Sequence, residues 1–165
     1  HNAMIDGQLS LFDDLSRLYN LHHFMLDNIT RLSELCLDTL RAAETLGQIR
    51  AVGSTLCARG QGGGAETMML SFQRLTANGR IAELLREMGG IRNKDLLNIL
   101  AGQSDKIESD TALLLQTIDQ QVLMEGAITL SADDFFKTAT RAIETVLNVF
   151  SLIINYAADN HAKLN

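Results

Sequence analysis

Proline and tryptophan are absent from this sequence, and aromatic residues make up only 5% of it. Proline is the residue that a helix interior tolerates least, because it has no amide hydrogen and its ring collides with the preceding turn. The apolar residues are mainly leucine, alanine, isoleucine and methionine. This composition predicts long, uninterrupted helices, and no strand pattern competes with them.

The sequence also lacks a basic charge balance and a long hydrophobic run. Its formal net charge is −6, which excludes nucleic acid as the expected partner because phosphate neutralisation needs a basic surface. No stretch reaches the roughly 18 consecutive apolar residues that a membrane span needs. We expect residues 1–165 to form one helical domain. The first three residues, before Met4, resemble an expression remnant.

Cysteine is scarce, since Cys36 and Cys57 are the only thiols. On one continuous helix they would lie about 31 Å apart, at roughly 1.5 Å per residue, which is far beyond disulfide reach. We therefore expect two buried free thiols. Metal-binding spacings such as CxxC and HExxH are missing as well, so the sequence predicts no metal site and no cofactor.

A seven-residue apolar repeat begins at Leu11 and continues to Cys57. Such a repeat is typical of a helix packed along the seam of a bundle. The predicted first helix runs to about Arg59 and is roughly 70 Å long. The cluster RGQGGG then ends it, because glycine is entropically costly in a helix.

Three more amphipathic helices follow the first one. The second begins near Ala65 and ends either at Gly89-Gly90 or near residues 101–105, where Ser104 would cap the next helix. The third stops near Gly126. The predicted inward residues of the second and third helices are Met68, Phe72, Leu75, Ala82, Leu85 and Met88, and Ile107, Leu114, Ile118 and Val122.

The fourth helix has the clearest start signal in the sequence. Ser131 is the predicted N-cap, and Asp134 follows three residues later in a capping-box-like pair. Four amphipathic helices with short connections predict an all-α fold, an antiparallel up-and-down four-helix bundle with a long first helix. The predicted inward residues of the last helix are Phe136, Ala139, Ile143, Val146, Phe150, Ile153 and Ala157.

The segments LFDDLSRLYNLHHFMLDNITRLSEL, LGQIRAVGSTLCARG and FFKTATRAIETV resemble a known family. They are similar to the helical sensing regions found outside the membrane in bacterial chemoreceptors and sensor diguanylate cyclases, in the nitrate- and nitrite-sensing domain group. The usual Arg-Gly of that group reads Arg50-Ala51 here, and its usual Ile-Asp reads Ile143-Glu144. The positions that match the first two motifs are Asp14, Tyr19, Leu21, Leu46, Gly47, Arg50 and Gly53.

The resemblance implies a periplasmic sensing or signal-relaying domain of a bacterial transmembrane receptor. It implies membrane spans and a cytoplasmic output module in the parent protein, and a small anion or carboxylate as ligand. Signalling would displace or rotate the first and last helices. We also expect a homodimer, because the first helix has apolar residues on more than one side. No nucleophile–base pair or facing carboxylates are recognisable, so no enzymatic activity is predicted.

Arg50 is the principal candidate for ligand binding. It occupies a seam position, where an unpaired guanidinium is costly to bury, and its forked donors match a planar oxyanion. Two structural alternatives remain open, a salt bridge with Glu44, Glu125 or Glu144, or a side chain that extends to solvent. A cytoplasmic helical adaptor that binds partner helices and keeps Arg50 in an internal salt bridge is the alternative function.

Five further residues are candidates for the same site: Gly47, Gly53, Tyr19, His22 and Thr140. The two glycines permit close approach of a ligand or, alternatively, of a packed helix. His22 is a ligand donor or a hydrogen-bonded core histidine.

The remaining side chains carry weaker expectations. Arg41 and Arg92 would add positive charge to the same cavity, and Arg141 would lie on the solvated surface. The methionines of the second helix are expected to fill the core, namely Met68, Met69 and Met88.

Overall fold

The computed structural model describes residues 32–162, and every regular element in this range is helical. The expected all-α class is therefore confirmed for this part of the chain. Within residues 32–162, no helix has both the length and the apolar character that crossing a membrane requires. The helices are α2 (Leu32–Arg59), α3 (Gly64–Gly89), α4 (Lys94–Ile99), α5 (Gln103–Thr117), the π-helix η2 (Ile118–Val122) and α6 (Ala132–Ala162).

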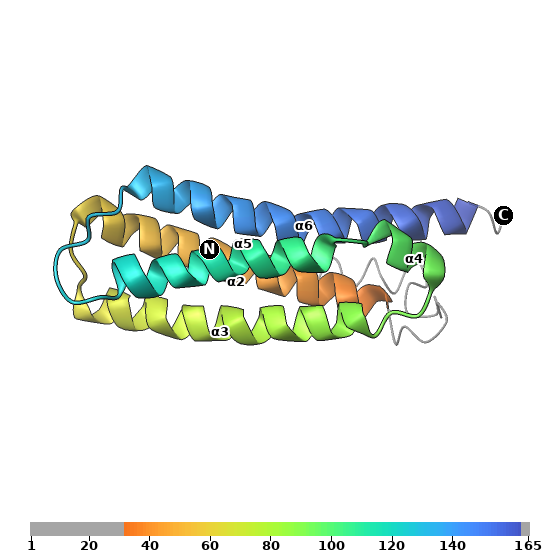
Figure 1. The fold of residues 1–165 in the computed structure, drawn as a ribbon, viewed down its shortest axis with the longest axis horizontal. Helices are drawn as coiled ribbons and strands as arrows, with labels where there is room; N and C mark the ends of the chain where they lie inside the picture. Colours follow the sequence, from red (N-terminus) through yellow and green to blue (C-terminus); the bar gives the residue numbers. More distant parts are fainter. Residues whose placement is uncertain (1–31, 163–165) are drawn as a thin grey trace.

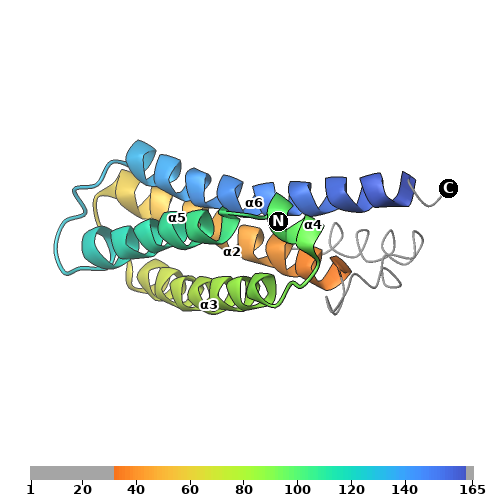
Figure 2. The ribbon, with the colours of Figure 1, turned by 45° about the vertical axis from the view of Figure 1, so that its right-hand side comes forward.

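The four long helices α2, α3, α5 and α6 lie side by side along the long axis of the molecule (Figures 1 and 2). α2 packs against both α6 and α3, and α5 also packs against both of them. The short helix α4 contacts α6. Each long helix therefore has two neighbours and contributes one face to a shared core, which includes Ile49, Leu84, Leu114 and Val146.

The apolar repeat of the first predicted helix is confirmed from Leu32 onward. One half-buried exception, Arg50, interrupts the buried seam, and the part of the repeat before Leu32 lies outside the described residues. Gly60 follows α2 with a positive φ of 68°, and its amide donates to the carbonyls of Leu56 and Cys57. The buried seam positions are Leu32, Cys36, Thr39, Ala43, Leu46, Gly53 and Cys57.

The predicted inward face of the second helix is wrong. Met68, Met69, Phe72 and Leu75 are exposed, so these methionines do not fill the core, whereas Met88 does. The helix carries two apolar stripes, and the outer stripe contains Phe72, the single aromatic residue of α3. The periodicity of the sequence identifies both stripes, but it does not indicate which of them packs against the other helices. The buried stripe of α3 is Leu70, Ala77, Ile81, Leu84 and Met88.

The helix boundaries settle the open alternatives. α3 ends at Gly89, with Gly90 as its C-cap, so the break at Gly89-Gly90 is confirmed. Ser104 does not cap the next helix, because α5 begins at Gln103, after Gly102 with a φ of 73°. The inward residues predicted for the third helix are all buried: Ile107, Leu114, Ile118 and Val122.

The start of α6 confirms the Ser131 cap. The Asp134 amide donates to Ser131 Oγ at 3.0 Å, and that hydroxyl donates to Asp134 Oδ2 at 2.7 Å. The first aromatic of the helix was assigned wrongly, however. Phe135 is fully buried, whereas the predicted core residue Phe136 is 47% exposed. The two rings are adjacent in sequence, so they point to different sides of the helix.

Candidate functional site

The position of Phe135 fixes how α6 approaches α2. Its ring lies over Gly53, where an added Cβ would be 2.2 Å from the ring carbons. Only glycine leaves room for this contact, so the close approach expected at Gly53 is packing against an aromatic ring. With Phe135 turned inward, Phe136 is directed outward on the same turn of α6.

Arg50, one turn before Gly53 on α2, meets this outward part of α6. Its Nη1 donates to Thr140 Oγ1 at 3.0 Å. Its guanidinium carbon lies 4.7 Å from the centre of the Phe136 ring, which is within the range of a cation–π interaction. The structure therefore brings together Arg50 and Thr140, two of the predicted site residues. It adds Phe136, which the sequence analysis had placed in the core.

The charge of Arg50 has no carboxylate partner among residues 32–162. Arg50 therefore does not form the expected alternative, a salt bridge with Glu44, Glu125 or Glu144. Glu44 instead accepts a hydrogen bond from Gln48 Nε2 at 3.0 Å. A guanidinium has five N–H donors, and the described side chains accept only one of them. Chemically, the group can still bind an acceptor with two oxygens in a plane.

Among residues 32–162, no helix approaches Gly47 closely. A Cβ at this position would meet no atom within 4 Å, so the surface one turn before Arg50 is open. Tyr19 and His22 lie outside the described residues. Arg41 pairs with Asp38 and therefore does not add its charge to Arg50, and Arg92 is exposed between α3 and α4.

A second polar site, absent from the sequence analysis, joins α5 to α6. Asp110 is only 7% exposed. It accepts hydrogen bonds from Arg141 Nε and from Thr145 Oγ1, each at 2.7 Å. Arg141 was expected on the solvated surface, and its side chain is 64% exposed, but its guanidinium forms an ion pair with this carboxylate. The signal was present in the sequence, because Asp110 falls between the buried positions Ile107 and Leu114.

Burial alone would raise the pKa of Asp110. The hydrogen bonds from Arg141 and Thr145, and the positive charges of Arg141 and Lys106, outweigh burial and lower the pKa below its ordinary value. The lowered pKa favours the ionised carboxylate, both of its oxygens accept hydrogen bonds from α6, and it holds α5 against α6.

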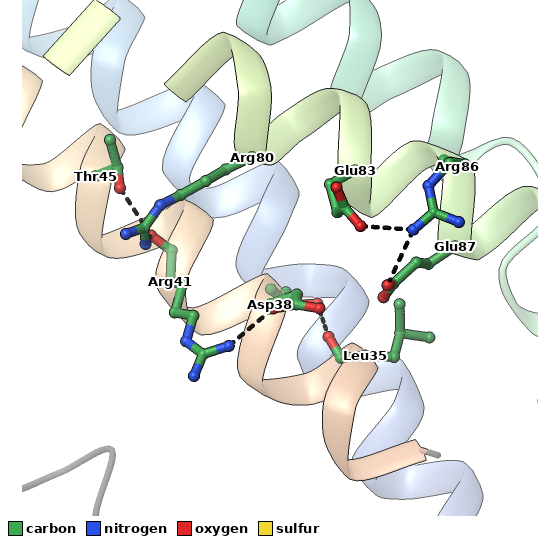
Figure 3. Close-up of polar contacts among 9 residues, drawn as sticks. Leu35, Asp38, Arg41, Thr45, Arg80, Glu83, Arg86 and Glu87 are labelled. Carbon is green, nitrogen blue, oxygen red and sulfur yellow. Dashed lines mark hydrogen bonds and ion pairs between the residues drawn. The ribbon is translucent and has the colours of Figure 1, made fainter. Parts of the chain in front are cut away.

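A third polar group lies between α2 and α3 (Figure 3). Arg41 Nη1 lies 3.1 Å from Asp38 Oδ1, and Arg80 Nη1 donates to the Arg41 carbonyl at 2.8 Å. Burial, followed by the charge and hydrogen bond of Asp38, raises the pKa of Glu87. A shallow hollow of about 180 Å³ beside this group is lined by Asp38, Arg41, Gly79, Arg80 and Glu83. In this hollow Arg41 pairs with Asp38, Glu83 pairs with Arg86, and Arg80 donates to a backbone carbonyl.

The two cysteines are free and buried, as expected. Burial raises the pKa of the Cys36 thiol to about 12, so this thiol is neutral and unreactive at physiological pH. In the part of the chain that the structure describes, no group of three or more His, Cys, Asp or Glu side chains could hold a metal ion.

Comparison with known protein families, with curated proteins and with solved structures found no match. The assignment of a function therefore depends on the geometry described above and on the sequence motifs.

Proposed function

We propose that this chain is a ligand-sensing or signal-relaying domain of a bacterial transmembrane receptor, that it lies in the periplasm, and that it is not an enzyme. The observation that carries the proposal is the contact of Arg50 with Thr140 and Phe136. This contact links α2 to α6 and leaves the positive charge of Arg50 without a carboxylate partner in the described range.

A small oxyanion such as nitrate, or a carboxylate, is the proposed ligand. Its planar oxygens would accept from the unused N–H donors of Arg50 and from the Thr140 hydroxyl, which is both a donor and an acceptor. Both residues belong to the contact between two long helices, so an anion would change the packing of that contact. A ligand that binds one arrangement of α2 and α6 more tightly than another shifts their equilibrium.

The proposed architecture is an antiparallel up-and-down bundle whose first helix extends upstream of α2. The order of the long helices in the chain and their pairwise packing support this arrangement. In the receptor, the ends of the first and last helices would continue into membrane spans. A displacement at the α2–α6 contact would therefore be transmitted along these two helices to the membrane.

The resemblance to the nitrate- and nitrite-sensing group supports the receptor context. Residues of its two separate motifs, Arg50 and Gly53 in one and the FFKTAT segment with Phe135 and Thr140 in the other, lie in one helix contact. The adaptor alternative requires Arg50 in an internal salt bridge, which the described carboxylates do not supply. Hydrophobic spans of about 20 residues on either side of this segment in the gene would favour the receptor.

A thermal-shift titration tests the ligand. The 165-residue chain is heated with nitrate, nitrite, acetate or a dicarboxylate, and chloride at equal ionic strength is the reference. At a ligand concentration of about 100 times Kd, binding stabilises the fold by ~2.7 kcal/mol, which raises Tm by roughly 5–10 °C. Arg50→Ala should abolish the shift, and Thr140→Val should reduce it by removing one hydrogen-bonding group.

The matched control is Arg92→Ala, which removes an exposed arginine away from this contact. It should leave the shift unchanged. A shift of equal size in wild type and Arg50→Ala would remove Arg50 from the binding site. If none of the anions shifts the wild-type chain, the proposal of an anion site at α2–α6 is wrong.

A further inference from the structure

The outward face of α3 is uncharged over most of its length. Between Ala65 and Ala82 no exposed residue is charged, and all of the exposed residues except Asn78 are apolar or glycine. Phe72, for example, is 69% exposed. Isolated exposed apolar residues are ordinary, but a continuous strip of them marks an interaction surface. We call this strip the α3 outer face, and it consists of Ala65, Met68, Met69, Phe72, Leu75, Gly79 and Ala82.

The α3 outer face repeats every seven residues. Two series of residues run along it, and the second is offset from the first by three positions. They correspond to the a and d positions of a heptad repeat, the pattern by which two helices pair along a seam. The buried stripe of α3 lies on the opposite side of the helix, and no helix among residues 32–162 covers the seam. The series are Ala65, Phe72 and Gly79, and Met68, Leu75 and Ala82.

The area of the α3 outer face is sufficient for a weak dimer. Its four large residues, Met68, Met69, Phe72 and Leu75, are between 52% and 73% exposed. At roughly 200 Å² for a residue of this size, they expose on the order of 500 Å² per copy. Two copies would therefore bury about 1,000 Å², which is close to the lower limit of a specific interface. An area of this size fits a concentration-dependent dimer.

The direction of pairing follows from the proposed function, on which this step rests. The start of α2 and the end of α6 lie at the same end of the bundle (Figure 1), and in the receptor both helices would continue toward the membrane. Two copies in one membrane are therefore parallel, and the two-fold axis that relates them runs along their helices. We propose that two copies of this chain pair through their α3 outer faces in a parallel, in-register dimer.

A parallel, in-register pair brings no like charges together along the strip. Each a or d residue then faces its own counterpart, and between Ala65 and Ala82 all of these residues are uncharged. The chain has a net charge of −6, so two copies repel each other least where the surface is uncharged. The positions that flank the seam in this range are also uncharged, namely Met69, Ser71, Thr76 and Asn78.

The C-terminal end of the strip fixes the register. Asn78 occupies a g position, and in a parallel pair this position faces Glu83, the following e position, of the other copy. The Asn78 amide can donate a hydrogen bond to that carboxylate, and the two-fold axis repeats the contact. Arg86 would be the next a residue, so the apolar seam ends at Ala82. Beyond it, Arg86 keeps its ion pair with Glu83 of its own chain.

Sedimentation velocity tests the dimer. The 165-residue chain should show a monomer–dimer equilibrium over a range of concentrations. Leu75→Glu should abolish the dimer, because the two new carboxylates would face each other in the centre of the seam. Phe72→Ala should raise Kd about tenfold or more, as expected for a central aromatic residue. A wild-type chain that stays monomeric up to about 1 mM, or a dimer that survives Leu75→Glu, overturns the proposal.

Leu75→Glu keeps the test independent of folding. Leu75 is 63% exposed, and glutamate is a good helix former. At a concentration where the wild type is monomeric, Tm of the variant should therefore stay within about 3 °C of the wild-type value. Leu113→Glu, on the exposed side of α5, is the matched control and should leave Kd unchanged.

Disulfide cross-linking tests the direction of pairing. Met68→Cys and Ala82→Cys lie two heptads apart, which is about 21 Å along the helix. In the parallel pair each new thiol faces its own counterpart, so both variants should form covalent dimers on oxidation. The wild-type thiols are buried, and Leu113→Cys on α5 is the control that should not cross-link. An antiparallel pair brings identical residues together only beside its axis, so cross-linking at one position or at neither overturns the parallel dimer.

The dimer and the anion site can fail separately. Cross-linking is measured without ligand, and the thermal-shift titration at Arg50 needs no second copy. Covalent dimers at both positions in a chain that no anion stabilises would support the dimer and contradict the anion site. An anion-dependent shift in a chain that stays monomeric would support the anion site and overturn the dimer.

Discussion

Two arginines hold α6 to its neighbours, and they do so in different ways. Arg141 reaches the buried carboxylate of Asp110 on α5, and Thr145 completes that site. Arg50 reaches α6 from α2, and within residues 32–162 its guanidinium contacts only a hydroxyl and an aromatic ring. The α5–α6 contact therefore pairs its cation with a carboxylate, whereas the described part of the α2–α6 contact supplies no carboxylate for Arg50. A helix contact that is already satisfied holds the fold, and one with spare donors is available to a ligand.

Of the substitutions that test this comparison, replacement of Asp110 should have the largest effect on stability. Asp110→Ala removes the acceptor of Arg141 and Thr145, so the free energy of unfolding should fall by about 2 kcal/mol, the size expected for hydrogen bonds to a buried charged group. Urea denaturation measures this change. Glu108→Ala, an exposed carboxylate on the same helix, should change stability by less than about 0.5 kcal/mol. Equal effects of the two substitutions would contradict the structural role of Asp110.

The next effect compares two glycines of α2. Gly53→Ala places a Cβ against the Phe135 ring, and overpacking of this kind costs roughly 1–3 kcal/mol. Gly47→Ala enters open space and should stabilise the chain by about 0.5–1 kcal/mol, because alanine is the better helix former. Thermal unfolding of both variants should therefore shift in opposite directions. A stabilising Gly53→Ala would show that α6 does not pack on α2 in this way.

The third effect is the loss of stability when Arg50, in the α2–α6 contact, is replaced. Without ligand, Arg50→Ala should lower the free energy of unfolding by no more than about 1 kcal/mol. It removes a hydrogen bond to the uncharged hydroxyl of Thr140 and a partly exposed cation–π contact with Phe136. Denaturation in a chloride buffer measures it beside Asp110→Ala. A loss larger than that of Asp110→Ala would reverse the comparison and make Arg50 the structural arginine.

The smallest effects are in the pH dependence. The pKa of Asp110 is lowered, so its stabilisation is present above the ordinary carboxyl range and is lost as the pH falls through the lowered pKa. The pKa of Glu87 is raised, so ionising it opposes folding as the pH rises through the raised value. We expect Asp110→Asn to flatten the acid limb of stability against pH. Glu87→Gln should slightly stabilise the chain near neutral pH, because it removes a carboxylate that is partly buried beside the charge of Asp38. A loss of stability in Glu87→Gln would contradict this unfavourable interaction.

The sequence predicted most of the fold because its periodicity and caps are local signals. The Ser131 cap, the glycine break after Arg59 and the buried positions of α2 and α5 all follow from residues close together in the chain. The face of α3 was predicted wrongly for a non-local reason. Both stripes of α3 are apolar, and only the position of α2 and α5 decides that the stripe with Leu70 is buried and the one with Phe72 is exposed.

The candidate site was predictable in part for the same reason. Arg50 and Thr140 were identified from their places near seams, and the structure brings them together. Phe136 was missed because choosing between two adjacent phenylalanines depends on which one fits over Gly53. Asp110 was missed although it occupies a seam position, because its partner Arg141 lies on another helix and periodicity does not say which residues of two helices meet.

The ring of Phe135 over Gly53 also limits how α6 can move. Sliding α6 lengthwise along α2 would move that ring away from Gly53, the residue whose missing Cβ makes room for it. Tilting about Gly53 leaves the ring seated. This contact lies near the C-terminal end of α2 and the N-terminal end of α6. A tilt about it would therefore displace the opposite ends of the two helices most.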